Sequence, residues 1–299
     1  MIVNNLIYDN EISESIIYSH WKEFVYKYES LPNIQRDFLF RGQSNFIDDE
    51  NKNKWKPYGL KTTLQRKYFG ANSNELINTL DYFIKYKDKY RSLSKLNFTN
   101  TENYLSLILY LRHAGIPMPV LDVTFDPLTA LYFAVHDLII AYGVTSCKNE
   151  DDIRYISIFE FDKSVLIEHY GAKEIREIKF LQSGTVNTVL LITEIEKLAF
   201  HNANMLKQNG AFIFLSSNHS LDVHLNNINE LQYKTTFKEL PKAIKHHKIP
   251  FKSVIPEFGD RANVFKYLAS KSKAGFSLFE DAQALLFDFK NPYFINVFC

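Results

Sequence analysis

The sequence predicts an α+β fold with one mixed domain, in which small central β-sheets carry helices packed around a cleft. Segments with apolar residues at helical spacing concentrate in the first half of the chain. Runs of β-branched and aromatic residues, typical of strands, are dispersed through the second half. No repeat or low-complexity linker interrupts the chain. We therefore expect an N-terminal helical extension over residues 1–30 and a single domain over residues 31–299.

The helices are predicted from apolar stripes and from residues that favour helix ends. Apolar stripes cover residues 12–28 and 73–90. The clearest start is at Asp126, a good N-cap residue that is followed by Pro127 at the first helical position. Weaker signals predict further helices over residues 102–114, 196–208, 257–271 and 280–289.

The strands are predicted from short runs of β-branched and aromatic residues. The first is the FLFRG segment beginning at residue 38, which is followed by a polar stretch, 47–59, with the composition of a surface loop. A second extended segment, VLDVT at 120–124, precedes the helix at Pro127. Further strands are expected over residues 154–161, 188–195, 211–216 and 248–256.

The composition bounds the class of protein. The 299 residues are 46% hydrophobic, and their formal charge is only +1. This charge argues against a protein that coats nucleic acid, because such proteins carry an overall surplus of basic residues. The two cysteines, Cys147 and Cys299, make a disulfide framework or a cysteine metal site improbable. The N-terminus lacks the pattern of a signal peptide, and the longest apolar stretch, 128–142, is too short for a membrane span. We expect a cytoplasmic protein without metal and without a membrane partner.

Polar residues end two of the apolar strands. Arg41 either leaves the core for the surface or points into a pocket, and Gly42 then lets a ligand approach the backbone. Asp122 either accepts backbone N–H groups or, with Thr124, holds an anion or a sugar near the helix that begins at Pro127. An unpaired charge at a buried strand end is costly, so we expect Arg41 and Asp122 to share one cleft. The helix at Pro127 should point its N-terminus into that cleft.

Other motifs are absent or weak. His246 and His247 lie in a basic stretch that looks exposed, and adjacent residues do not face the same way on a strand or helix, so a metal pair is not expected. The chain has no glycine-rich phosphate loop, no HExxH and no Gly-x-Ser-x-Gly element. It also lacks the carboxylate clusters of metal-dependent nucleases.

The sequence resembles a known family, the FRG domain, a bacterial and phage-associated module. FRGQ at 40–43 and HAGIPMPVLDVTFDPLTALYFA at 113–134 carry the resemblance, and it extends more weakly to GLKTTLQR at 59–66 and KQNGAFIF at 207–214. The chain departs from the family pattern where two arginines are usual: Met118-Pro119 replaces Thr-Arg, and Asn204 replaces an arginine.

The motif order of this family is similar to that of the ADP-ribosyltransferase fold of the Arg–Ser–Glu type. The resemblance implies an NAD-using toxin or anti-phage defence effector, either an ADP-ribosyltransferase or an NAD glycohydrolase. Its partners would be a protein or nucleic-acid acceptor and a cognate antitoxin or defence-system protein. The implied catalytic residues are Asp122 and Thr124, and the implied NAD-binding residues are Arg41, Gly42, Gln43, His113 and Gln208.

An alternative stays open, because the segment KQNGAFIF at 207–214 offers Gln208 where Arg–Ser–Glu enzymes have an acid. In that alternative the chain is a non-catalytic ligand-binding or sensor module on the same fold. Arg41 and Asp122 would then form a structural salt bridge.

Overall fold

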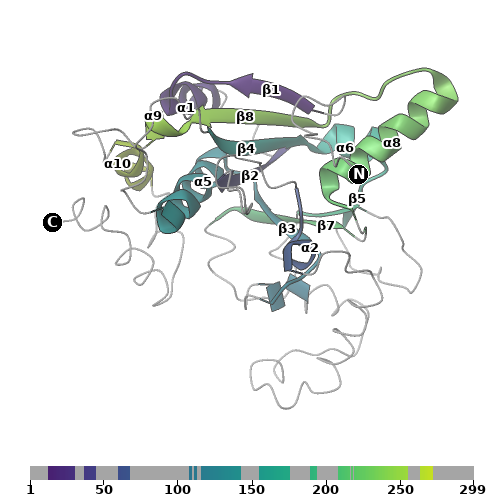
Figure 1. Ribbon diagram of the computed structural model, residues 1–299, viewed down its shortest axis with the longest axis horizontal. Helices are drawn as coiled ribbons and strands as arrows, with labels where there is room; N and C mark the ends of the chain where they lie inside the picture. Colours follow the sequence, from purple (N-terminus) through teal and green to yellow (C-terminus); the bar gives the residue numbers. More distant parts are fainter. Residues whose placement is uncertain are drawn as a thin grey trace, which may run out of the picture.

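The described part of the chain forms one mixed β-sheet with helices on both faces (Figure 1). The computed structural model describes residues 13–30, 37–44, 60–67, 108–109, 111–112, 116–142, 155–175, 189–193, 208–215, 217, 219–254 and 263–271. The α+β class is confirmed. The expectation of several small sheets is wrong for these residues, because their eight strands belong to one sheet in the order β1-β8-β4-β2-β3-β7-β6-β5.

The elements have the following bounds. The strands are β1 Ser13–Ile17, β2 Phe38–Ser44, β3 Val120–Thr124, β4 Tyr155–Asp162, β5 Lys173–Ile175, β6 Val189–Ile192, β7 Gly210–Leu215 and β8 Ile244–Pro250. The helices are α1 Trp21–Glu29, α2 Thr63–Lys67, α5 Pro127–Tyr142, α6 Lys163–Tyr170, α8 Leu221–Thr236, α9 Phe251–Val254 and α10 Asn263–Ser270.

The sheet consists of two half-sheets that meet at one residue pair. Strand β2 pairs antiparallel with β4 over its whole length, with Phe38 opposite Asp162 and Ser44 opposite Ile156. With β3 on its other side, β2 pairs only through Phe40 and Thr124. The half-sheet β1-β8-β4-β2 and the half-sheet β3-β7-β6-β5 are therefore joined at a single position, where a gap can open between them.

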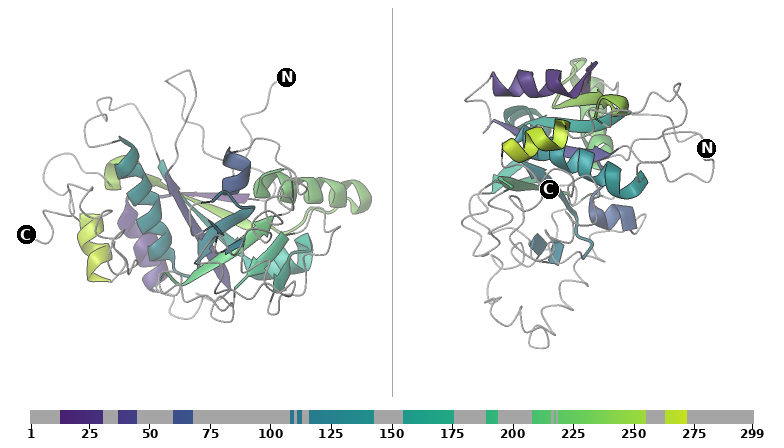
Figure 2. Two further views of the ribbon diagram at one scale, coloured as in Figure 1. Left: turned by 90° about the horizontal axis from the view of Figure 1, so that it is seen from below. Right: turned by 90° about the vertical axis from the view of Figure 1, so that its left-hand side faces the viewer.

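Helices cover both faces of the sheet. Figure 2 shows α1, α5 and α10 close together on one side, where their apolar residues pack in one cluster with Phe40 and Ile158. Residues of α6 and α8 pack on the other face with Leu39, Leu121 and Phe161. Alternate residues of β2 thus face different cores, which is the expected geometry of a strand buried on both faces.

Helix α5 begins where the sequence predicts. The Asp126 carboxylate accepts the Leu128 N–H at 3.0 Å and the Thr129 hydroxyl at 2.7 Å, so it caps the helix. The helix lies against β2 at Gly42, where a Cβ atom would overlap the Ala130 carbonyl oxygen. Close packing of α5 on β2 therefore accounts for the absence of a side chain at this position.

Several elements differ from the predictions. The apolar stripe over residues 12–28 is a strand followed by a helix, because residues 13–17 pair with β8. Strand β8 begins at Ile244, and residues 251–254 form α9 instead of continuing the strand. Helices α2, α6 and α8 were not predicted. The predicted helices over 73–90 and 280–289, the loop over 47–59 and residues 196–207 of another helix lie outside the described residues.

Replacing Gly42 with alanine tests the packing of α5 on β2. The new Cβ would lie 2.7 Å from the Ala130 carbonyl carbon and 2.9 Å from the Ala134 nitrogen, and these backbone atoms can move aside only if the helix shifts. We expect G42A to lower the free energy of unfolding by about 3 kcal/mol or more.

Gly171 provides the control for this measurement by urea unfolding. It has a φ of +68°, but nothing lies within 4 Å of the position that a Cβ atom would take, so G171A should cost only about 1 kcal/mol. Equal losses in the two variants would contradict the packing role of Gly42.

Candidate functional site

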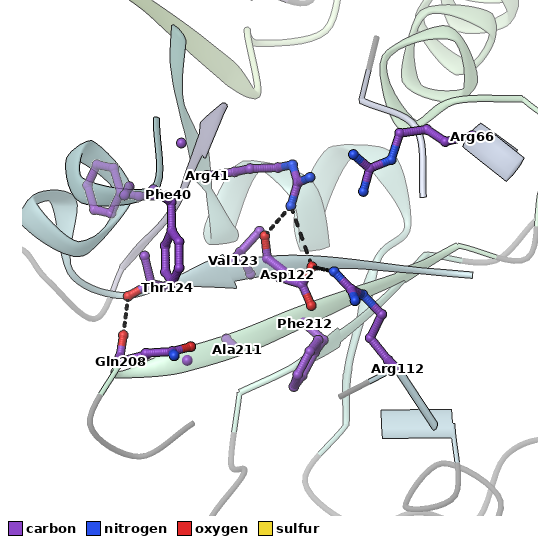
Figure 3. Close-up of a pocket in the computed structure, with 14 residues that line it drawn as sticks. Phe40, Arg41, Arg66, Arg112, Asp122, Val123, Thr124, Gln208, Ala211 and Phe212 are labelled. Carbon is purple, nitrogen blue, oxygen red and sulfur yellow. Dashed lines mark hydrogen bonds and ion pairs between the residues drawn. The ribbon is translucent and has the colours of Figure 1, made fainter. Parts of the chain in front are cut away.

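A cavity of about 290 Å³ lies where β2 and β3 part (Figure 3). Both half-sheets contribute to its walls, together with α5, α2 and the helical turn at 111–112. The lining residues are Phe40, Arg41, Gly42, Arg66, Arg112, Asp122, Val123, Thr124, Ala130, Phe133, Gln208, Gly210, Ala211 and Phe212.

Three guanidinium groups are directed to this cavity. Arg41 comes from β2, Arg66 from α2, and Arg112 from the turn at 111–112. They are all the arginines in the described part of the chain, and no lysine lines the cavity there. A guanidinium binds carboxylate and phosphate groups through a planar fork of donors. These side chains therefore offer the kind of donors that an anionic ligand requires.

Arg41 connects the two half-sheets across the gap. Its Nη1 donates a hydrogen bond to the Asp122 carbonyl oxygen at 2.6 Å and lies 3.9 Å from the Asp122 Oδ2. The Arg41 side chain is only 10% exposed. The expectation that Arg41 and Asp122 share one cleft is confirmed.

Asp122 is the only acidic residue in the described lining. Its carboxylate forms an ion pair with the Arg112 Nη2, and its side chain is 42% exposed. Three positive groups and one negative group line the cavity, which leaves an excess of two positive charges among these residues. Among the described lining residues, positive groups therefore outnumber negative ones, which favours an anionic ligand.

Thr124 and Gln208 meet at the end of β3. The Thr124 hydroxyl donates to the Gln208 carbonyl oxygen at 2.7 Å and accepts the Asp126 N–H at 3.0 Å. Its proton is thus used within the protein, so towards a ligand this hydroxyl can act only as an acceptor. Thr124 ties β3 to both the turn at 208–209 and the start of α5.

The remaining predicted residues are placed differently. Gln43 is buried but does not line the cavity. His113 lies outside the described residues. Helix α5 lines the cavity with its flank, through Ala130 and Phe133, so the expectation that its N-terminus points into the cleft is wrong. Asp126 turns away to cap the helix, as expected.

The two ends of the cavity differ in character. Figure 3 shows Phe40, Thr124 and Gln208 towards one end and Arg66 and Arg112 towards the other. The Asp122 carboxylate lies between them, beside Arg112. A ligand with a planar ring at one end and an anion at the other matches this polarity.

Sequence reasoning missed Arg66 and Arg112. Arg66 is the last residue of GLKTTLQR, and Arg112 directly precedes His113, where the second segment with family resemblance begins. Helix α2 is held in place by Gln65, whose Nε2 donates to the carbonyl oxygens of Ser217 and His219, both at 2.7 Å. These two arginines bring guanidinium groups to the cavity although the usual family arginines are replaced.

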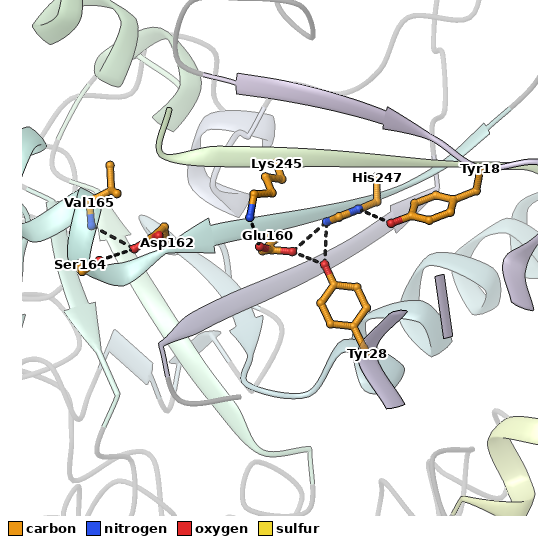
Figure 4. A network of polar contacts seen from close by, with 8 residues as sticks. All are labelled: Tyr18, Tyr28, Glu160, Asp162, Ser164, Val165, Lys245 and His247. Atoms are coloured by element: carbon orange, nitrogen blue, oxygen red, sulfur yellow. Dashed lines mark hydrogen bonds and ion pairs between the residues drawn. The ribbon is translucent and has the colours of Figure 1, made fainter. Parts of the chain in front are cut away.

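A second polar cluster lies between β4, β8 and α1 (Figure 4). Glu160 accepts hydrogen bonds from Lys245 at 2.9 Å, from His247 at 3.0 Å and from Tyr28. The Nδ1 of His247 lies 3.0 Å from the hydroxyl of Tyr18. None of these residues lines the cavity. Because Tyr18 and Tyr28 contact residues of β4 and β8, the cluster attaches residues 13–30 to the sheet.

The charges in this cluster follow from burial and hydrogen bonding. Burial opposes ionisation of Glu160, but the hydrogen bonds from His247, Tyr28 and Lys245 outweigh it and hold the pKa of Glu160 at about 2. Burial lowers the pKa of His247 below its ordinary value, against the pull of Glu160. We therefore assign an ionised Glu160 that accepts the Nε2–H of a neutral His247.

The neighbouring His246 faces the other way. Its ring stacks on Phe159 with centroids 4.6 Å apart, and its Nε2 lies 2.6 Å from the Ser157 hydroxyl. The two histidines point to opposite faces, as expected, but both are buried, so the exposed stretch that we predicted is wrong.

Among the residues that the structure describes, no group of three or more His, Cys, Asp or Glu side chains is arranged to hold a metal ion. No helix there has both the length and the apolar character needed to cross a membrane.

Comparison with family models gives a match for part of the chain. Residues 36–139 match the family model of the FRG domain, which confirms the resemblance over this segment. The segment contains β2, β3, most of α5 and all three arginines of the cavity. Searches among curated proteins and among solved structures found no match for the chain.

Replacing Arg41 with alanine tests its role as a bridge between the half-sheets. The Asp122 carbonyl oxygen would lose a charged donor in a part-buried position, so R41A should lower the free energy of unfolding by about 1.5–3 kcal/mol. Urea unfolding of R41A, R41K and the wild type measures the loss, and lysine should restore part of it. An R41A protein as stable as the wild type would show that the bridge has no structural role.

The pH dependence of unfolding tests the Glu160 assignment. The pKa of Glu160 falls from about 4.5 in the unfolded chain to about 2 in the folded protein. Its contribution to stability is therefore present above about pH 4.5 and is lost as the pH falls towards 2. The full contribution is about 3 kcal/mol.

The difference between the wild type and E160Q reports the ionisation of Glu160 together with its coupling to His247, because the two groups shift each other's pKa. We expect the difference in unfolding free energy to shrink steadily below pH 4.5. E230Q, on the exposed part of α8, should show no such difference. A wild-type advantage that stays constant with pH would mean that Glu160 is not the titrating group.

Proposed function

We propose that this chain, which carries an FRG domain over residues 36–139, uses NAD as a substrate and acts as an ADP-ribosyltransferase-like effector. The observation that carries the proposal is the polarity of the cavity, with a guanidinium end, an aromatic and polar end, and one carboxylate between them. With the motif resemblance, this favours a toxin or an anti-phage defence effector of a bacterial cytoplasm.

The parts of NAD match the two ends of the cavity. NAD carries a diphosphate, and Arg66 and Arg112 offer the planar donor forks that bind phosphate oxygens. At the other end, Gln208 offers an amide for the nicotinamide group, and the partly buried Phe133 adds an aromatic ring to the cavity lining. The nicotinamide-bearing ribose would then lie near Asp122.

Asp122 would supply the electrostatic stabilisation that the reaction needs. The bond between ribose C1′ and the nicotinamide nitrogen breaks, and its electron pair leaves with nicotinamide, so positive charge develops on the ribose. A carboxylate close to that charge lowers the barrier. An acceptor nucleophile then bonds to C1′ and releases its proton. If the acceptor is water, the products are ADP-ribose and nicotinamide, and the protein is an NAD glycohydrolase.

A second candidate function is a non-catalytic binding or sensor module. It is favoured by the ion pair between Asp122 and Arg112, which partly neutralises the only carboxylate in the described lining. The position of Gln208 on the cavity wall also supplies an amide where an acid would be expected. Such a module would bind the same ligand without breaking the glycosidic bond.

Nicotinamide release from NAD tests the proposal. The purified protein is incubated with NAD, with and without cell lysate as a source of acceptors, and nicotinamide is measured by chromatography. We expect D122N to lose turnover while it stays folded, because the substitution removes the carboxylate. We expect R66A to weaken NAD binding roughly tenfold or more.

K234A is the matched control, since it removes a positive charge from the exposed surface of α8, away from the cavity. It should behave as the wild type. NAD binding without nicotinamide release, in buffer and in lysate, would favour the binding module. A wild-type protein that does not bind NAD would overturn both candidate functions.

A further inference from the structure

We propose that Asp122 acts as the resident counterion of the anion site, and that the phosphate groups of the ligand displace its carboxylate from Arg112. The claim about anion binding stands on the geometry of the cavity. Only its consequence for turnover rests on the proposed function.

The contacts of Asp122 place it where a ligand anion would bind. Its Oδ2 is paired with the Arg112 Nη2 and lies 3.9 Å from the Arg41 Nη1. A carboxylate between two guanidinium groups occupies donors that would otherwise be available to phosphate oxygens. In the ligand-free protein, Asp122 therefore competes with any anion that enters.

The Asp122 carboxylate can move, whereas the Asp122 main chain and its bond to Arg41 are fixed. The Asp122 side chain is 42% exposed, so its carboxylate can rotate away from Arg112 without opening the core. The Asp122 main chain is fixed, because β3 pairs with β7 from Val120 to Thr124. Arg41 donates to the Asp122 carbonyl oxygen and not primarily to its carboxylate, so this bond survives the rotation.

The charge balance favours the exchange. The described lining has three guanidinium groups and one carboxylate, and a diphosphate adds negative charge where positive groups outnumber negative ones. When the carboxylate leaves Arg112, it no longer shares its charge with that guanidinium. In the proposed reaction it would then face the ribose at the moment when the substrate is in place, so ligand binding and formation of the catalytic group would be coupled.

Binding of inorganic pyrophosphate tests the displacement directly. Titration calorimetry compares the wild type with D122N, which keeps the shape of the side chain and removes its charge. We expect D122N to bind pyrophosphate about five- to tenfold more tightly, since the competing carboxylate is gone. E230Q changes the net charge equally on the exposed surface of α8 and should bind as the wild type does.

A double-mutant cycle with R112Q identifies the partner. If the gain in D122N arises because Arg112 becomes available, D122N/R112Q should show no gain over R112Q. Equal or weaker pyrophosphate binding by D122N would overturn the displacement, and so would a gain that persists without Arg112.

Pyrophosphate binding and nicotinamide release test the displacement and the proposed function separately. A gain in D122N together with no nicotinamide release by the wild type would support the displacement and contradict the enzyme. Nicotinamide release without a gain in D122N would support the enzyme and contradict the displacement. If both hold, D122N should bind NAD more tightly than the wild type and turn it over far more slowly.

Discussion

The cavity depends on one constraint, which is that β2 and β3 pair at the single position Phe40–Thr124. On its other side, β2 pairs with β4 along its whole length. From one face, α5 presses against β2 so closely that only glycine fits at residue 42. Its pairing with β4 and its packing on α5 therefore fix the position of β2. Beyond Phe40 and Thr124 the two strands do not pair, and this leaves the gap between the half-sheets.

The same gap explains where the charge lies. A largely buried guanidinium is costly unless hydrogen bonds compensate for the loss of water, and the Asp122 carbonyl and carboxylate supply this compensation for Arg41. Arg66 and Arg112 come from segments outside the sheet and complete the positive end of the cavity. Asp122 thus has three roles in one residue: its carbonyl fixes Arg41, its carboxylate balances Arg112, and in the proposed reaction it stabilises the ribose.

The sequence predicts those parts of the fold that depend on local signals. The cap at Asp126 with Pro127 fixes the start of α5, and the FLFRG and VLDVT runs predict β2 and β3. Tertiary contacts decide the rest. The apolar stripe over residues 12–28 fits either a helix or a strand, and pairing with β8 selects a strand for residues 13–17. The contributions of Arg66 and Arg112 could not be predicted because chain packing, not spacing, brings them to Arg41.

The most direct test of the account is a crystal structure of the protein with ADP-ribose. We predict that the diphosphate lies against the guanidinium groups of Arg66 and Arg112, with the terminal ribose beside Asp122 and the Asp122 carboxylate turned away from Arg112. ADP-ribose bound outside the gap between β2 and β3, or bound there with its diphosphate away from these arginines, would contradict the account.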